Sequence, residues 1–212
     1  FLETMESLGH LAQERERHPD AAEIYAELVE SRRAVYGEEH PSVAQALLWQ
    51  STALTKSGRA PAAETAMTEA FGLLEHQFAD EPVQFAQSLL AGAELMSQGG
   101  QIKGALVHQK QALDILMKEL DENHGQIWDA RELVASSLAG VGQLEEAIEL
   151  LEYCREHRTE VAEHRRGALL KNLAGLYLAT GHQERAEDLY EQASSLLTKS
   201  LGPDHPAALA TA

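Results

Sequence analysis

The sequence predicts an all-α protein, an α-α superhelix of about five helix pairs followed by the start of a sixth. The composition favours helix, because Ala, Leu and Glu are abundant while only 6 of the 212 residues are proline and 5% are aromatic. A repeat is also visible, since Gly58, Gly100, Gly142 and Gly181 follow one another at intervals of 42, 42 and 39 residues. Self-similarity at such a period is typical of solenoid proteins built from one recurring structural element.

Small residues stand at fixed distances from these glycines, which is the third observation. They occur seven residues before the glycine, five after it and twelve after it. Positions that accept only small side chains indicate two helices in close approach, because a larger side chain would overpack the contact. The members are, in the order of these three positions, Ser51, Ala93, Ala135 and Ala174; Ala63, Ala105, Ala147 and Ala186; and Ala70, Ala112, Cys154 and Ala193.

Each repeat is predicted to consist of a helix, a tight turn at the glycine, a second helix and a linker. Glycine suits the turn because a left-handed backbone is least costly for a residue without a side chain. The first repeat spans about residues 1–40 and has Glu16 at the turn position instead of glycine. The second spans 41–81 and the third 82–124, and both begin at a proline. Proline is favoured at the first position of a helix, which supports these boundaries.

The later repeats follow in the same frame. The fourth, 125–163, continues after its turn with the helical stretch GQLEEAIELLEYC. The fifth, 164–204, carries apolar residues at helical spacing before its turn. A further helix starts within 205–212, so a single solenoid accounts for all 212 residues. Because the sequence opens with Phe1, we expect it to be a segment of a longer chain.

The stretches EEHPSV and PDHPAA place a histidine-proline pair where a new helix begins. Polar groups before the first turn suit the positive end of a helix. His40 and His205 lie whole repeats apart, and His124 occupies the same place without a proline. We therefore interpret these histidines as helix-entry signals and predict no metal site.

Charge and cysteine content exclude several classes of function. Asp and Glu number 34 against 17 Lys and Arg, and the resulting formal net charge of −17 disfavours nucleic acid and anionic membrane surfaces as partners. No apolar run reaches the length of a membrane span, and no signal peptide is visible. One cysteine cannot form a disulfide framework. A soluble, intracellular chain in the cytoplasm or an organelle interior is expected.

No motif points to catalysis. The sequence lacks a Walker-type phosphate loop and has no HExxH, GxSxG or CxxC motif. Cys154 stands where three other repeats have alanine, which predicts a small buried packing residue. We expect no enzyme activity, no cofactor and no metal.

Residue by residue, the repeat resembles the tetratricopeptide repeat. The stretch NLAGLYLATGHQERAEDLYEQA, residues 172–193, carries the small, aromatic, glycine, alanine, aromatic and alanine pattern of that family. The 42-residue period with its GEEHP and GPDHP linkers is similar to the long-helix variety found in kinesin light chains. The resemblance covers nearly the whole chain.

The resemblance implies a concave groove lined by the first helix of each pair, with partner-facing residues at set positions on that helix. Packing against the neighbouring repeat is an equal alternative for Trp49. Only Lys171 and Asn172 resemble the array with which some members grip the C-terminal tails of chaperones, so that ligand is not expected. The candidate groove residues are the apolar Leu48, Trp49, Leu90 and Leu133, the acidic Glu94, Asp129 and Glu132, and Lys171 and Asn172.

One basic island, CREHRTEVAEHRRG at residues 154–167, interrupts the acidic sequence. Acidic residues alternate with its arginines, so a solvated turn whose charges pair with one another is the simpler interpretation. A contact with an anionic partner is the alternative.

These observations predict a non-catalytic interaction scaffold that holds a protein or peptide segment in its groove. The preferred segment has one or two apolar residues flanked by Lys or Arg. A second hypothesis is a structural subunit or assembly factor that docks onto a large complex by its convex face or repeat ends. A third is the regulatory or sensor region of a longer signalling protein.

Overall fold

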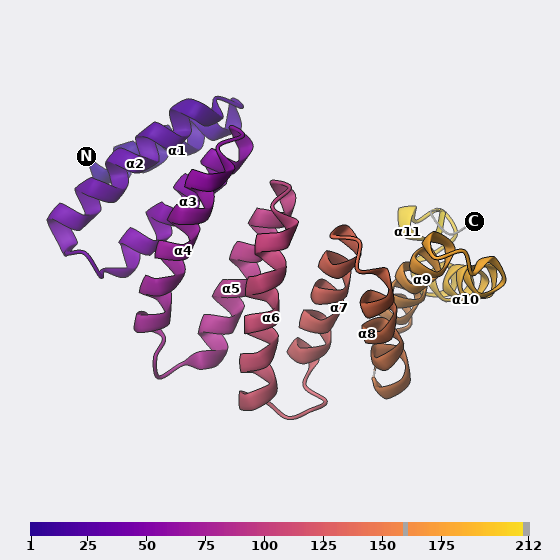
Figure 1. The fold of residues 1–212 in the computed structure, drawn as a ribbon. Helices are drawn as coiled ribbons and strands as arrows, with labels where there is room; N and C mark the ends of the chain where they lie inside the picture. Colours follow the sequence, from indigo (N-terminus) through magenta and orange to yellow (C-terminus); the bar gives the residue numbers. More distant parts are fainter. Residues whose placement is uncertain (159–160, 210–212) are drawn as a thin grey trace. The chain divides into compact units, whose positions relative to one another are not determined.

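The computed structural model describes residues 1–158 and 161–209, which form eleven helices and no strand. The helices gather into two compact units, an N-terminal unit of residues 1–119 and a C-terminal unit of residues 120–212. Consecutive helices in each unit pack as pairs, which confirms the predicted all-α architecture (Figure 1). That both units belong to one continuous solenoid stays a prediction.

The N-terminal unit contains three helix pairs. Within it, the second helix of the first pair also packs against the first helix of the second pair. The pairs are α1 (Leu2–Glu14) with α2 (His18–Tyr36), α3 (Pro41–Lys56) with α4 (Ala60–Gln77), and α5 (Pro82–Gln98) with α6 (Ile102–Glu119).

The C-terminal unit contains two helix pairs and one short helix that packs on the last of them. The short helix confirms the start of a sixth pair, while residues 210–212 of the predicted segment lie outside the described residues. The elements are α7 (Gly125–Gly140) with α8 (Leu144–His157), α9 (Glu163–Ala179) with α10 (Gln183–Leu201), and α11 (Pro206–Leu209).

The turn between the two helices has the same backbone conformation in every pair. The four turn glycines have φ between +77° and +86°, in the left-handed region. In the second pair, the N–H of Arg59, just past the turn glycine, donates to the carbonyl of Leu54 at 2.9 Å, as in a Schellman motif. Glu16 adopts the same kind of backbone with φ +58°, the one non-glycine residue with positive φ in the described part of the chain. The predicted turn frame is therefore confirmed in all five pairs.

Replacing Glu16 with glycine is expected to stabilise the N-terminal unit by about 0.5–1 kcal/mol. A side chain in the left-handed region costs roughly 1 kcal/mol, and glycine gives back part of that gain through its greater freedom in the unfolded chain. Urea unfolding midpoints measure the effect. Gly58→Ala is the matched control, because its φ is +77° with no atom within 4 Å of an added Cβ, so strain alone should destabilise it. Lower stability of the Glu16→Gly variant would contradict the strain argument.

The linker histidines cap the helices that follow them. His40, His124 and His205 each accept, through Nδ1, the backbone N–H of the residue two positions later, at 3.2, 3.3 and 3.2 Å. The first N–H groups of a helix have no partner within it, so the imidazole satisfies one of them. The histidines thus act at helix starts, as the sequence indicated.

A His124→Ala substitution should lower the stability of the C-terminal unit by about 1 kcal/mol, the usual cost of losing an N-cap. His124→Asp should restore stability, because a carboxylate accepts the same N–H and also suits the positive end of α7. Thermal melting of the three proteins compares them. If the alanine and aspartate variants melt alike, the cap contributes nothing.

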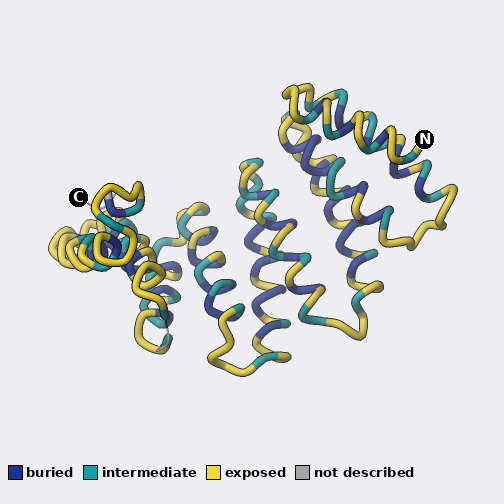
Figure 2. Tube along the Cα trace, turned by 180° about the vertical axis from the view of Figure 1, so that it is seen from behind, coloured by how far each residue is buried: buried dark blue, intermediate teal, exposed yellow. Residues whose placement is uncertain are grey.

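The core of each unit lies between its helices. Figure 2 shows buried positions recurring along the faces where helices meet, with exposed residues on the opposite faces. Every small residue at the three predicted positions is buried, and the hydroxyl of Ser51 donates to the carbonyl of Ala63 at 2.9 Å. These contacts confirm the close approach of the two helices in a pair. Among the described residues, no helix has both the length and the apolar character that crossing a bilayer requires.

Candidate functional site

The predicted groove residues lie on the first helices of their pairs and divide between the two units. Those of the N-terminal unit are on α3 and α5, and those of the C-terminal unit are on α7 and α9. Each unit contains a cavity that includes some of them, and each is described separately. The members are Leu48, Trp49, Leu90 and Glu94 in the first unit, and Asp129, Glu132, Leu133, Lys171 and Asn172 in the second.

A largely apolar cavity of about 550 Å³ lies between α3 and α5 in the N-terminal unit. Leu48 forms part of its wall from α3, and Leu74 and Phe78 close it from the end of α4. Ala91 and Leu95 complete the apolar lining from α5. Polar side chains of the same helices also line the cavity, but no Asp, Glu, Lys or Arg among the described residues does, so it suits an apolar side chain more than a charged one.

Two other predicted residues of this unit do not line the cavity. Leu90 is half-buried on α5, and Glu94 is exposed one turn further along the same helix. The Gln98 side-chain amide donates to the Glu94 carboxylate at 3.4 Å, and Glu94 is exposed to solvent. The sequence pattern does not distinguish these two residues from Leu48, which does line the cavity.

Trp49 packs against the first helix pair. Its ring centroid lies 4.7 Å from that of His10 and 5.8 Å from that of Tyr25, and the Arg32 guanidinium lies 5.2 Å from its centre. The side chain is only half-buried. Of the two interpretations of Trp49, the structure therefore shows the packing contact.

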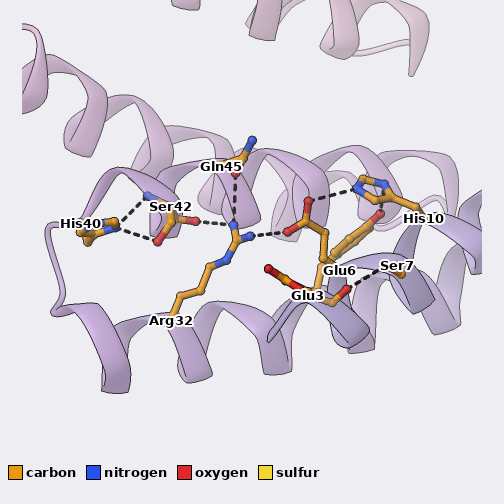
Figure 3. A network of polar contacts seen from close by, with 9 residues as sticks. Glu3, Glu6, Ser7, His10, Arg32, His40, Ser42 and Gln45 are labelled. Atoms are coloured by element: carbon orange, nitrogen blue, oxygen red, sulfur yellow. Dashed lines mark hydrogen bonds and ion pairs between the residues drawn. The ribbon is translucent and has the colours of Figure 1, made fainter. Parts of the chain in front are cut away.

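Arg32 is a buried cation near the end of α2, and it ties three helices together. Its guanidinium donates to Glu6 of α1 at 2.6 Å, to the carbonyl of Ser42 in α3 at 2.7 Å and to the Gln45 side chain at 3.4 Å. Figure 3 shows Arg32 reaching between Glu6 on one side and Ser42 and Gln45 on the other. Polar side chains of the chain itself thus bridge α1 and α3.

Tyr25 extends this network inside the first pair. Its hydroxyl lies 2.9 Å from Nδ1 of His10 and donates to the Gln13 side chain at 3.2 Å. Burial, assisted by the negative charge of Glu6, raises the pKa of Tyr25 to about 12. The phenol therefore stays protonated at neutral pH and serves as a fixed donor.

The C-terminal unit has a more polar cavity, of about 370 Å³, between α7 and α9. Glu132 and Ser136 line it from α7, and Lys171 and Asn172 line it from α9. Tyr190 of α10 contributes to its wall. The structure thus brings together three of the five predicted residues of this unit, whereas Leu133 is 38% exposed and does not line the cavity.

The two predicted acids of this unit are already paired within the chain. Arg158, whose side chain is 9% exposed, lies 2.7 Å from Glu132 and 3.3 Å from Asp129. Arg165 adds a two-pronged contact to Asp129, with nitrogen–oxygen distances of 2.9 and 3.1 Å. Burial raises the pKa of Glu132, and the charge of Arg158 opposes that shift. Two arginines of the basic island thus neutralise acids of α7, which lie outside the island, instead of forming the predicted solvated turn whose charges pair with one another.

Cys154 has the environment of a packing residue. Its side chain is 1% exposed, and burial raises the pKa of the thiol to about 11, with Glu132 adding to the shift. The thiol is therefore protonated at neutral pH and is a poor nucleophile. Within residues 1–158 and 161–209, no group of three or more His, Cys, Asp or Glu side chains is arranged to hold a metal ion.

The family model of the tetratricopeptide repeat matches residues 1–76 and 129–199. Among solved structures, kinesin light chain TPR-like repeats from Podosopora anserina are similar at 23% identity, with a TM-score of 0.72, over 94% of this chain and 96% of that one. BtubC (BKLC) from P. vanneervenii is similar at 15% identity and a TM-score of 0.64, over 96% and 82% of the two chains.

A further similar structure is the Rap conjugation gene regulator of plasmid pLS20, solved in complex with the Phr* peptide. It is 15% identical with a TM-score of 0.54, and the match covers 96% of this chain and 54% of the regulator. A sequence comparison with curated proteins gives no match.

Proposed function

Because the chain belongs to the tetratricopeptide repeat family, a family of protein-interaction scaffolds, we propose that it binds a partner segment in the groove of its N-terminal unit. In this proposal, an apolar side chain of the segment enters the cavity between α3 and α5. The cavity lined by Leu48, Leu74 and Ala91 is the observation that carries the proposal. The role is one of binding and needs no catalytic group.

The chemistry of the cavity defines the anchor. Leu48, Leu74, Phe78 and Leu95 supply aliphatic and aromatic carbon and no charged group. An apolar side chain that leaves water for such a wall gains about 25 cal/mol for each Å² buried. The Phr* peptide bound to the Rap regulator supports a peptide as the class of ligand, since that regulator has a similar fold.

Charge favours basic residues beside the anchor. The chain carries a formal net charge of −17, and Glu94 is exposed on α5 beside the cavity-lining Leu95. A segment with Lys or Arg flanks would be attracted to this surface, mainly through a faster and salt-sensitive association. Asp129 and Glu132 have no part in this preference, because arginines of the same chain already neutralise them.

A displayed library of short random peptides, selected on the full chain, provides the probe. The selected peptides should share an apolar residue, and an Ala91→Glu substitution should weaken their binding about 30-fold, which corresponds to about 2 kcal/mol. Ala91 is exposed and lines the cavity, so the new side chain blocks the site without entering the core. A new acid would by itself favour a basic peptide, so the loss reports the blocked cavity.

Ala62→Glu is the matched control, because Ala62 is exposed on α4 and does not line the cavity. It should bind the selected peptides like the parent. If Ala91→Glu also binds like the parent, or if the control loses binding as well, the α3–α5 cavity is not the site and the proposed function is wrong.

A further inference from the structure

The repeats can be aligned with one another through their turn residues, Glu16, Gly58, Gly100, Gly142 and Gly181. Two positions then vary together, the residue ten before the turn and the residue sixteen after it. In each of the first four repeats, these two positions hold either an acid and an arginine or two leucines. The pairs in chain order are Glu6 with Arg32, Leu48 with Leu74, Leu90 with Leu116, Glu132 with Arg158, and Lys171 with Leu197.

The same two positions form part of a junction between neighbouring first helices. In the α1–α3 junction, the Arg32 guanidinium contacts Glu6 on α1 and the Ser42 carbonyl on α3. In the α3–α5 junction, Leu48 and Leu74 stand at the corresponding places and both line the apolar cavity. The shorter apolar pair therefore leaves open a space that the acid–arginine pair fills.

A third position, nine residues before the turn of the following repeat, also differs between the two junctions. In the α1–α3 junction it is Trp49, whose ring lies 5.2 Å from the Arg32 guanidinium. In the α3–α5 junction it is Ala91, which has no side chain long enough to cover Leu74. Arg32 and Trp49 together occupy the first junction, and their counterparts leave the second one open.

The α7–α9 junction provides an independent comparison. It keeps the acid–arginine pair but has Asn172 at the place of Trp49. A cavity opens there, and its lining includes Ser136, Leu151 and Asn172. Counted from the turn, Ser136 and Leu151 correspond to His10 and Tyr25, the residues against which the Trp49 ring packs. Because Asn172 has no indole ring, the α7–α9 junction has a void at the place that the Trp49 ring occupies in the α1–α3 junction.

From these comparisons, we infer that Arg32 and Trp49 are specificity-determining residues that seal the α1–α3 junction and so, within the N-terminal unit, confine an apolar ligand group to the α3–α5 junction. The inference rests on the proposed function for its biological meaning, because a sealed junction matters only if an open one binds. The inference also predicts that removing the Arg32 and Trp49 side chains creates a second cavity for an apolar ring. This prediction can be tested without the natural partner.

Indole is the probe, because it is the group that Trp49 places in the first junction. The opening variant combines Glu6→Leu, Arg32→Leu and Trp49→Ala, which gives the first junction the residue types that the second one already has. With leucine methyl groups labelled for NMR, indole should shift the signals of Leu48 and Leu74 in the parent. In the opening variant it should in addition shift the leucines introduced at positions 6 and 32.

The closing variant makes the reverse change, with Leu48→Glu, Leu74→Arg and Ala91→Trp. Indole should shift no methyl signal of its α3–α5 junction, including that of Leu95. Circular dichroism and melting temperature establish that each variant is folded. If the opening variant gains no shifts at the introduced leucines, or the closing variant retains those of Leu95, the inference is wrong.

A single substitution keeps the inference testable if the triple variants do not fold. Trp49→Ala leaves the Glu6–Arg32 ion pair in place and creates a void beside His10 and Tyr25. Indole should raise the melting temperature of this variant more than that of the parent, because a ligand that binds only the folded state stabilises it. An equal effect on both proteins would overturn the inference. Peptide binding that is insensitive to Ala91→Glu would refute the proposed function alone.

Discussion

Replacing Arg158 with leucine is expected to lower the free energy of unfolding of the C-terminal unit by about 2–4 kcal/mol. Removing one partner of a buried ion pair typically costs about 3–5 kcal/mol, because the other charge is left buried and unpaired. The Glu132 side chain is 27% exposed, so water offsets part of that cost. Asp129 keeps its contact with Arg165 and adds little to the loss.

The Glu132→Leu, Arg158→Leu double variant should regain most of this stability. Leu48 and Leu74 occupy the corresponding positions of the second repeat, so an apolar pair is already present at this place elsewhere in the chain. Urea unfolding of the parent, both single variants and the double variant gives the coupling energy of the pair. A double variant as unstable as the sum of the two single variants would mean that the side chains do not interact.

The loss in Arg158→Leu should also depend on pH. Burial already raises the pKa of Glu132, and removing the arginine removes a charge that lowers it. A carboxyl whose pKa is raised on folding destabilises the folded state when it is ionised. The loss of stability in the Arg158→Leu variant is therefore largest at pH values above the raised pKa. It should shrink as the pH falls through that value toward the ordinary glutamate pKa. A deficit that is constant with pH would assign the loss to packing rather than charge.

An Ala147→Leu substitution should lower the stability of the C-terminal unit by about 1–3 kcal/mol. Ala147 is fully buried on α8 at one of the small positions, and three further carbon atoms there force neighbouring side chains or helices to move. Glu145→Gln is the control, because Glu145 is exposed on the same helix and should change stability by less than about 0.5 kcal/mol. Equal denaturation midpoints for both variants would show that the position tolerates a larger side chain.

The sequence predicts the repeat frame because the frame depends on local backbone chemistry. A left-handed turn favours glycine. The alignment finds the turn of the first repeat correctly, even though Glu16 stands there in place of glycine. Close helix approach favours alanine, which is why the small positions are buried as expected. Both signals recur in four of the five repeats, so they can be recognised from one sequence alone.

The groove was harder to predict, because its lining depends on side chains that come from the second helices of the pairs and from neighbouring repeats. The periodicity places Leu48 and Trp49 next to each other but does not say that one borders a cavity while the other packs on Tyr25. It also places Asp129 and Glu132 on the groove helix without showing Arg158 beside them. Comparing the residue ten before each turn with the residue sixteen after it is the sequence signal that would have found the ion pair.

The Glu6–Arg32 pair has a consequence for how the chain assembles. Similar repeats risk docking a helix against the wrong neighbour during folding, a characteristic failure of repeat proteins. An arrangement that placed Glu6 against Leu74, or Arg32 against Leu48, would bury a lone charge in an apolar contact at a cost of several kcal/mol. Among the three repeats of the N-terminal unit, only Glu6 and Arg32 carry charges at these two positions, so each charge is satisfied there only by its native partner. The pair therefore identifies α1 and α2 as belonging together, and mispaired intermediates should be short-lived.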